Sequence, residues 1–209
     1  MRSGTLRVSA CVIVAALAGA ANAGVTNMVI SGAFQNHNWD NSSGWDKGEE
    51  WNWGVGNPTS GGIPTGWAWA NENWVAGGSG ALNVSVTVDS DPDITITKNL
   101  TNNTGFAWTS FSIVLAQVPG FGVPSVYAGS LGSSRFSANS TVNGPTSATM
   151  TYSLAGSDTA VLPGQSVSFF FTFNIADNVV FQMIQTPVPT PGTAGLLGMC
   201  ALFAARRRR

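Results

Sequence analysis

The chain has 209 residues, of which 44% are hydrophobic, 10% are aromatic and only 9% are charged. A typical soluble domain has about 25% charged residues, so this composition excludes coiled coils, charge-rich helical bundles and acidic disordered chains. With one histidine and ten carboxylates, little acid–base chemistry is available, and we expect a protein that is not an enzyme and holds no cofactor.

The first 23 residues have the organisation of a secretory signal peptide. Two arginines precede an apolar run over residues 8–20, and this run closes with Ala21 and Ala23 in a small-x-small pattern. The pattern predicts that signal peptidase cuts before Gly24 and that the mature chain is exported.

Residues 24–186 form the predicted folded domain. This segment contains no cysteine, three basic residues and ten acidic residues, which gives a formal net charge of −7. A domain of this charge is not expected to bind nucleic acid. Without a disulfide, it depends on its hydrophobic core for stability.

Residues 35–80 hold seven of the eight tryptophans among Gly, Asn and Ser. Trp51 and Trp53 are two residues apart, as are Trp67 and Trp69. On strands each pair shares a face, and a hairpin would bring the pairs together. Such a platform would bind sugar rings, with hydroxyls bonded by Asn52, Asn71, Glu72 and Asn73. The alternative, which we favour from the residue types, is that these indoles pack into the core.

Further along the chain, apolar residues alternate with polar ones, a period that predicts half-buried strands. Asn-, Gly- and Pro-rich turns separate these runs. The sequence therefore predicts an antiparallel β-sandwich of seven to nine strands, Ig-like or jelly-roll-like. The alternating apolar positions are Leu82, Val84, Val86, Val88, Ile94, Ile96, Phe111, Ile113, Leu115, Met150, Tyr152, Leu154, Val167, Phe169, Phe171, Phe173 and Ile175.

Two groups of carboxylates are candidate sites. Asp89, Asp91 and Asp93 have the oxygen density that Ca²⁺ prefers, but the EF-hand pattern is absent, and we favour a charged turn that discourages pairing at a sheet edge. Glu49-Glu50 and Glu72 are the candidates for a glycosidase acid and nucleophile. Adjacent strand residues point to opposite faces, so Glu49 and Glu50 do not form such a pair by themselves.

The last 23 residues form a separate predicted segment. Pro187 and Pro189 are expected to end regular structure, so that no strand of the sandwich lies beyond 186. An apolar stretch over about 192–205 would form a membrane helix of about 21 Å, shorter than the ~30 Å hydrocarbon core. The four arginines that follow, Arg206, Arg207, Arg208 and Arg209, would stay on the cytoplasmic side.

Val188, Pro189, Thr190 and Pro191, the apolar helix and the arginine run together resemble the PEP-CTERM sorting signal, a segment also labelled ice-binding protein C-terminal domain. Thr190 stands where that family has glutamate. The resemblance implies that an exosortase-like membrane protease cuts the tail. It also implies delivery to the outer surface or exopolysaccharide matrix of a Gram-negative bacterium.

Together these features predict an exported, non-enzymatic protein of the cell surface or extracellular matrix, associated with exopolysaccharide. The first alternative is a carbohydrate-binding module that uses the tryptophan platform. A more remote one is a hydrolase of matrix polysaccharide.

Overall fold

The computed structural model describes residues 25–31, 50–56, 65–89 and 91–189. Apart from one 3-10 turn, η1 (Ala128–Ser130), the regular structure of these residues is β. The described strands are β1 (Val25–Ser31), β2 (Glu50–Gly56), β3 (Thr65–Trp74), β4 (Gly80–Val88), β5 (Asp93–Asn102), β6 (Trp108–Gln117), β7 (Ser125–Val126), β8 (Gly132–Ser133), β9 (Ala138–Asn143), β10 (Ser147–Ser153), β11 (Ser166–Asn174) and β12 (Val179–Pro189). The predicted all-β class is confirmed.

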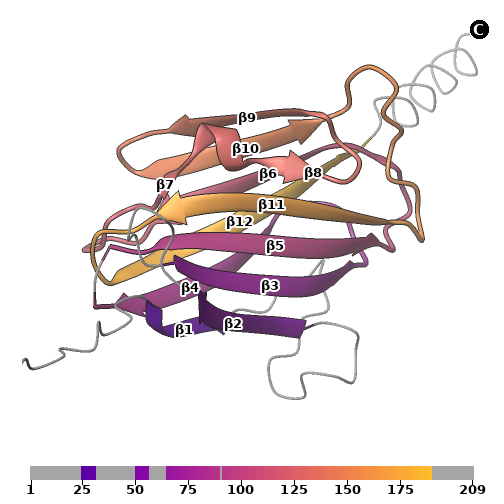
Figure 1. The fold of residues 1–209 in the computed structure, drawn as a ribbon. Helices are drawn as coiled ribbons and strands as arrows, with labels where there is room; N and C mark the ends of the chain where they lie inside the picture. The colour runs from indigo at the N-terminus through magenta and orange to yellow at the C-terminus, as the bar shows by residue number, and fades with distance from the viewer. Residues whose placement is uncertain (1–24, 32–49, 57–64, 90, 190–209) are drawn as a thin grey trace, which may run out of the picture.

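The strands form two layers (Figure 1). Sheet A has the order β1-β4-β12-β6-β10-β9, and sheet B has the order β2-β3-β5-β11-β7, with β8 also paired to β11. The described residues thus contain twelve strands, more than the seven to nine expected. Four strands were not recognisable in the sequence: β7 and β8 are only two residues long, and β9 and β12 lack a clear alternation of apolar and polar residues.

The expectation of a purely antiparallel sandwich is wrong at one place. β3 and β5 pair in parallel, whereas the other strand pairs described are antiparallel. The reason is that β4, which lies between them in the chain, belongs to the other sheet, so β5 returns to sheet B in the direction of β3.

Aromatic side chains from the two sheets meet in the core. Phe111 of β6 and Phe169 of β11 lie 4.8 Å apart between ring centroids, and Phe173 of β11 lies 5.8 Å from Phe181 of β12. The apolar positions predicted from the alternation are buried, except that Val88 and Leu154 are partly buried. Because the inward positions are apolar and the outward positions are polar, each strand buries one face in the core and exposes the other.

The turn after β5 is built around the buried Asn102. The amide nitrogen of Asn102 donates to the carbonyls of Phe106 (3.0 Å) and Val161 (2.8 Å), and its oxygen accepts from the backbone N–H of Thr104 (3.0 Å). These bonds satisfy backbone groups that the loop would otherwise bury unpaired.

The last described strand corrects the predicted end of the domain. β12 lies between β4 and β6 in the middle of sheet A and continues to Pro189. Pro187 and Val188 pair with Phe111 and Ser110 of β6, so a strand does occupy the first residues of the segment 187–209. Residues 187–189 pair with β6 on one side but with no residue of β4 on the other. Proline is tolerated in such a stretch because its missing N–H removes no ladder bond on the unpaired side.

This extension predicts that exported chains ending at 186 and at 189 differ in stability. Loss of residues 187–189 removes the buried Pro187 and the end of the β6–β12 ladder, and we expect the free energy of unfolding to fall by about 1–3 kcal/mol. Urea unfolding of the two chains measures the difference. Equal midpoints would mean that the end of β12 contributes nothing to the fold.

The predicted signal peptide, and the predicted tail from Thr190 onward, lie outside the described residues. This holds for Ala21, Ala23 and Gly24 at the predicted signal cleavage site, and for Thr190, Pro191, the helix over about 192–205 and Arg206–Arg209 in the tail. In the described part of the chain, no helix has the length and apolar character needed to cross a membrane.

Candidate functional site

The outward side of β3 presents two tryptophans followed by two asparagines. Trp67 is 41% exposed and Trp69 is half-buried, and Asn71 and Asn73 continue the same face. The intervening residues Ala68, Ala70, Glu72 and Trp74 are buried. The interpretation that we favoured from sequence, with these indoles in the core, is therefore wrong for Trp67 and Trp69.

The four tryptophans of the predicted platform do not share one face. β2 pairs with β3 as a predicted hairpin, but its register sets Trp51 opposite Ala70 and Trp53 opposite Ala68. Directly opposed residues of an antiparallel ladder lie on the same face, so positions 51 and 53 belong to the inward face of β3. The side chains of Trp51 and Trp53 are outside the described set.

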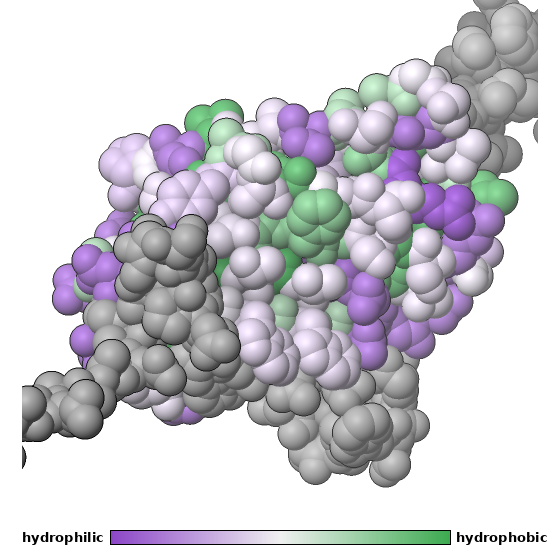
Figure 2. Space-filling view, in the orientation of Figure 1, coloured by the Kyte–Doolittle hydropathy of each residue, from purple (hydrophilic) through white to green (hydrophobic). Residues whose placement is uncertain are grey.

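The partners of Trp67 and Trp69 lie instead on β5 and β11. The strand registers define four rows across the outside of sheet B, which we call the outer face. The rows are Trp67–Thr95–Thr172, Trp69–Thr97–Phe170, Asn71–Asn99–Ser168 and Asn73–Thr101–Ser166. Figure 2 shows this side of the molecule, with green atoms near its middle, pale atoms around them and purple atoms gathered to the right.

Phe170 adds a third aromatic ring to this face. It is 46% exposed and lies in the row of Trp69. Gly132 of β8 lies directly against its ring, because a Cβ built at position 132 would come within 1.9 Å of it. Glycine at this position thus lets β8 pack beside the ring.

Hydrogen bonds between neighbouring strands hold the polar side chains of the outer face. The amide of Asn99 donates to the oxygen of Asn71 (3.1 Å) and accepts from the hydroxyl of Ser168 (2.7 Å). Asn103 donates to the oxygen of Asn73 (2.5 Å).

Two pairs of hydroxyl oxygens, Thr95 with Thr172 and Thr101 with Ser166, lie 2.9 Å and 3.0 Å apart. The orientations of these groups are therefore set before any ligand arrives.

The amide end of the outer face is hollowed. A cavity of about 350 Å³ is lined by Asn71, Glu72, Asn73, Asn99, Thr101, Asn103 and Ser166. Its volume lies at the lower end of the ~300–1,000 Å³ range of small-molecule sites. Most of the lining residues carry amide or hydroxyl groups, and the half-buried Trp69 and the exposed Trp67 follow on the same face of β3.

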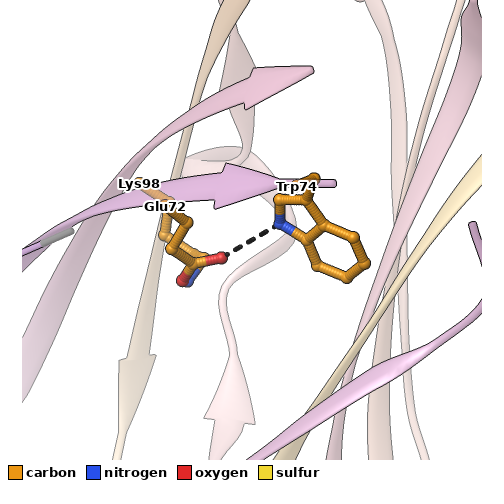
Figure 3. A network of polar contacts seen from close by, with 3 residues as sticks. All are labelled: Glu72, Trp74 and Lys98. Atoms are coloured by element: carbon orange, nitrogen blue, oxygen red, sulfur yellow. Dashed lines mark hydrogen bonds and ion pairs between the residues drawn. The ribbon is translucent and has the colours of Figure 1, made fainter. Parts of the chain in front are cut away.

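The inward side of β3 carries a buried charged pair. Glu72 and Lys98 form an ion pair with fully buried side chains, and the indole N–H of Trp74 donates to the same carboxylate at 3.4 Å (Figure 3). Burial lowers the pKa of Lys98 to about 7, while the adjacent carboxylate favours the charged ammonium.

This pair removes Glu72 from two of its predicted roles. Glu72 borders the cavity, but its side chain is buried and paired with Lys98, so its carboxylate is not presented to a ligand on the outer face or to a substrate in a catalytic groove. Of the other two carboxylates considered for hydrolysis, Glu49 lies outside the described residues, and the side chain of Glu50 is not described.

The three aspartates of the candidate calcium site do not form one cluster of ligands in the structure. Asp93 accepts hydrogen bonds from the hydroxyl of Tyr127 (2.8 Å) and the amide of Asn174 (3.1 Å), and Asp89 and Asp91 are exposed. Within the described ranges, no group of three acidic, His or Cys side chains is placed to hold a metal ion.

Sequence reasoning did not find the contribution of β5 and β11 to this face. The signal available was the polar half of each alternation, Thr95, Thr97, Asn99 and Thr101 on one strand and Ser166, Ser168 and Thr172 on the other. What the alternation alone does not tell is that these strands lie beside β3, since that depends on the parallel pairing of β3 with β5.

Comparison with known proteins gives no relative for this chain, because no family model, no curated protein and no solved structure matches it.

Proposed function

We propose that this chain is an exported, non-enzymatic protein of the bacterial surface or extracellular matrix, and that it binds glycan through the outer face of sheet B. The observation that supports this most is the outward placement of Trp67 and Trp69 beside fixed rows of amides and hydroxyls. This joins the matrix role and the carbohydrate-binding role, which the sequence left as alternatives.

Sugars require this combination of groups. One side of a pyranose ring presents C–H groups that pack on an aromatic surface, and its rim presents hydroxyls that both donate and accept hydrogen bonds. Large aromatic side chains exposed on a strand commonly mark a binding surface, since their apolar area is otherwise left in water. Asparagine, with both a donor and an acceptor, matches hydroxyls better than a charged group does.

A binding role fits the outer face better than hydrolysis does. Glycosidases need two carboxyl groups about 5–10 Å apart across the scissile bond. None of the twelve side chains in the four rows is a carboxylate. Asp93 lies one row beyond Trp67 and is bonded to Tyr127 and Asn174. Glu50 is in register with Asn71, six residues further along the strands, or about 20 Å from Asp93, which is too far for such a pair.

Retardation in native gels tests the binding. Exported protein is run through gels with and without soluble polysaccharide. Slower migration in the polysaccharide gel supports the proposed function, whereas equal migration with every polysaccharide tried contradicts it. The variants that assign the binding to Trp67 and Trp69 are given in the Discussion.

Export and surface sorting are the second part of the proposal. They rest on the sequence pattern of the first 23 residues and on the resemblance of the tail to PEP-CTERM signals. Signal peptidase would cut before Gly24, and an exosortase-like protease would cut near Pro189, Thr190 and Pro191. Because Val188 and Pro189 belong to β12, a cut after Pro189 leaves the ladder of sheet A complete.

Processing at both ends gives a direct test of export. We expect N-terminal sequencing of the surface-localised protein to begin at Gly24, and its intact mass to lack the segment that ends in Arg209. A stable surface species that starts at Met1 contradicts the signal peptide, and one that still carries Arg209 contradicts the sorting signal.

A further inference from the structure

The outer face has no basic group among the twelve side chains of its four rows, and position 50, which continues the row of Asn71 onto β2, is a glutamate. The twelve side chains are aromatic, amide or hydroxyl. Lys98 lies in the middle of β5, but its side chain points into the core, between the outward Thr97 and Asn99. A ligand on this face therefore meets no cation from the rows themselves.

An acidic glycan is poorly matched to such a surface. Binding would strip water from its carboxylate or sulfate groups, and the strong compensating contacts are charge-assisted bonds from Arg or Lys. The predicted mature domain also carries a formal net charge of −7, which repels a polyanion at a distance.

The polarity of the face also changes along the strands. The rows of Trp67 and Trp69 supply the aromatic surface, and the rows of Asn71 and Asn73 supply the amides that line the cavity. The seven residues from Trp67 to Asn73 span about 20 Å on a strand. This length suits several linked sugars better than one.

From these observations we propose that the outer face binds an uncharged, linear glycan that lies along β3 and β5. Its ring faces pack on Trp67 and Trp69, and its hydroxyls bond the amides around Asn71. The inference rests on the proposed function and adds the chemical class of the ligand. Neutral hydroxyls gain their bonds here at low entropic cost, because the hydrogen bonds between Asn71, Asn99 and Ser168 fix the receiving groups.

Affinity electrophoresis of the whole exported protein tests the ligand class. One set of native gels contains neutral polysaccharides (β-glucan, xylan, mannan and dextran), and the other contains alginate and polygalacturonate. We expect retardation by at least one neutral polymer, little changed by 0.5 M salt, and none by the acidic polymers, since only charge-based binding is strongly screened.

A matched pair of variants locates the contact. Asn71→Ala removes an amide from the cavity and is expected to weaken neutral-glycan binding by about 3- to 10-fold, the worth of one hydrogen bond. Asn139→Ala makes the same change at an exposed position of β9 in the other sheet, and it should leave binding unchanged. Equal effects of the two variants would overturn the placement on the outer face.

The results separate this inference from the proposed function. Salt-sensitive retardation by alginate or polygalacturonate alone overturns the neutral class and leaves glycan binding standing. Absence of retardation in every gel overturns both.

Discussion

We expect the replacement of both Trp67 and Trp69 with alanine to abolish retention of the protein by glycan and to leave its fold intact. Trp67 is 41% exposed and Trp69 half-buried on the outer face, so their removal opens no large cavity in the core. A tryptophan at the centre of a binding surface commonly contributes about 2 kcal/mol or more, which corresponds to about 30-fold in affinity for each side chain. Affinity electrophoresis measures the retention, and thermal unfolding measures the stability.

The same strand provides the control. Trp74 is fully buried and contacts Trp108 and Phe111 edge-on, at centroid distances of 6.3 Å and 5.8 Å. Trp74→Ala should lower the free energy of unfolding by about 3–5 kcal/mol, as core Trp substitutions do. If the double variant at 67 and 69 instead loses stability on that scale and retains glycan binding, the outer face is not the binding site.

The alternation of apolar residues was sufficient to predict the layers of this fold. Val167, Phe169, Phe171 and Phe173 are inward in the sequence pattern and buried in the structure, because a strand with one buried face has a strict period of two. The strand β12 was harder to recognise. It contains Gln182 and Gln185 and ends in a proline-rich stretch, although its inward residues Phe181 and Met183 follow the same rule.

The face of each tryptophan could not be derived from its spacing alone. Trp67 and Trp69 share a face, as two residues two apart on a strand must, and that part of the prediction is confirmed. Spacing does not tell whether this face points into the core or to solvent. Trp74 lies an odd number of residues from Trp67 and Trp69, so it is on the opposite face of β3, and this face is buried together with Ala68 and Ala70. Because β3 has tryptophans on both faces, its sequence allows either face to be the buried one, and only the packing against the second sheet determines which face is buried.

The buried pair of Glu72 and Lys98 connects this core to the outer face. Ala70 of β3 is in register with Lys98 of β5, and Glu72 is in register with Leu100, so the ion pair runs diagonally across the parallel ladder. A slip of one residue would turn every side chain of a strand to the other face. We infer that the pair helps to fix the register in which Trp67, Trp69 and Asn71 all face outward.

Lys98→Met is therefore expected to lower the free energy of unfolding by about 3–5 kcal/mol, because it leaves the carboxylate of Glu72 buried without its ammonium partner. The double variant Glu72→Met/Lys98→Met should be closer to the native chain than Lys98→Met is, since both charges are then removed from the core. Urea unfolding of the native chain, the single variants Lys98→Met and Glu72→Met, and the double variant measures this coupling. A double variant that is less stable by the sum of the two single losses would mean that the pair is not coupled.

The pH dependence of stability gives an independent signature of the same lysine. Burial lowers the pKa of Lys98 from 10.5 to about 7, so between these values the unfolded chain binds more protons than the folded chain does. The free energy of unfolding of the native chain should then rise as the pH increases from 7 towards 10, since stability increases with pH wherever the unfolded state binds more protons. In Lys98→Met this rise should disappear. A native chain whose stability is flat or falls over that interval would show that the folded protein keeps Lys98 charged, with the attraction of Glu72 outweighing the cost of burial.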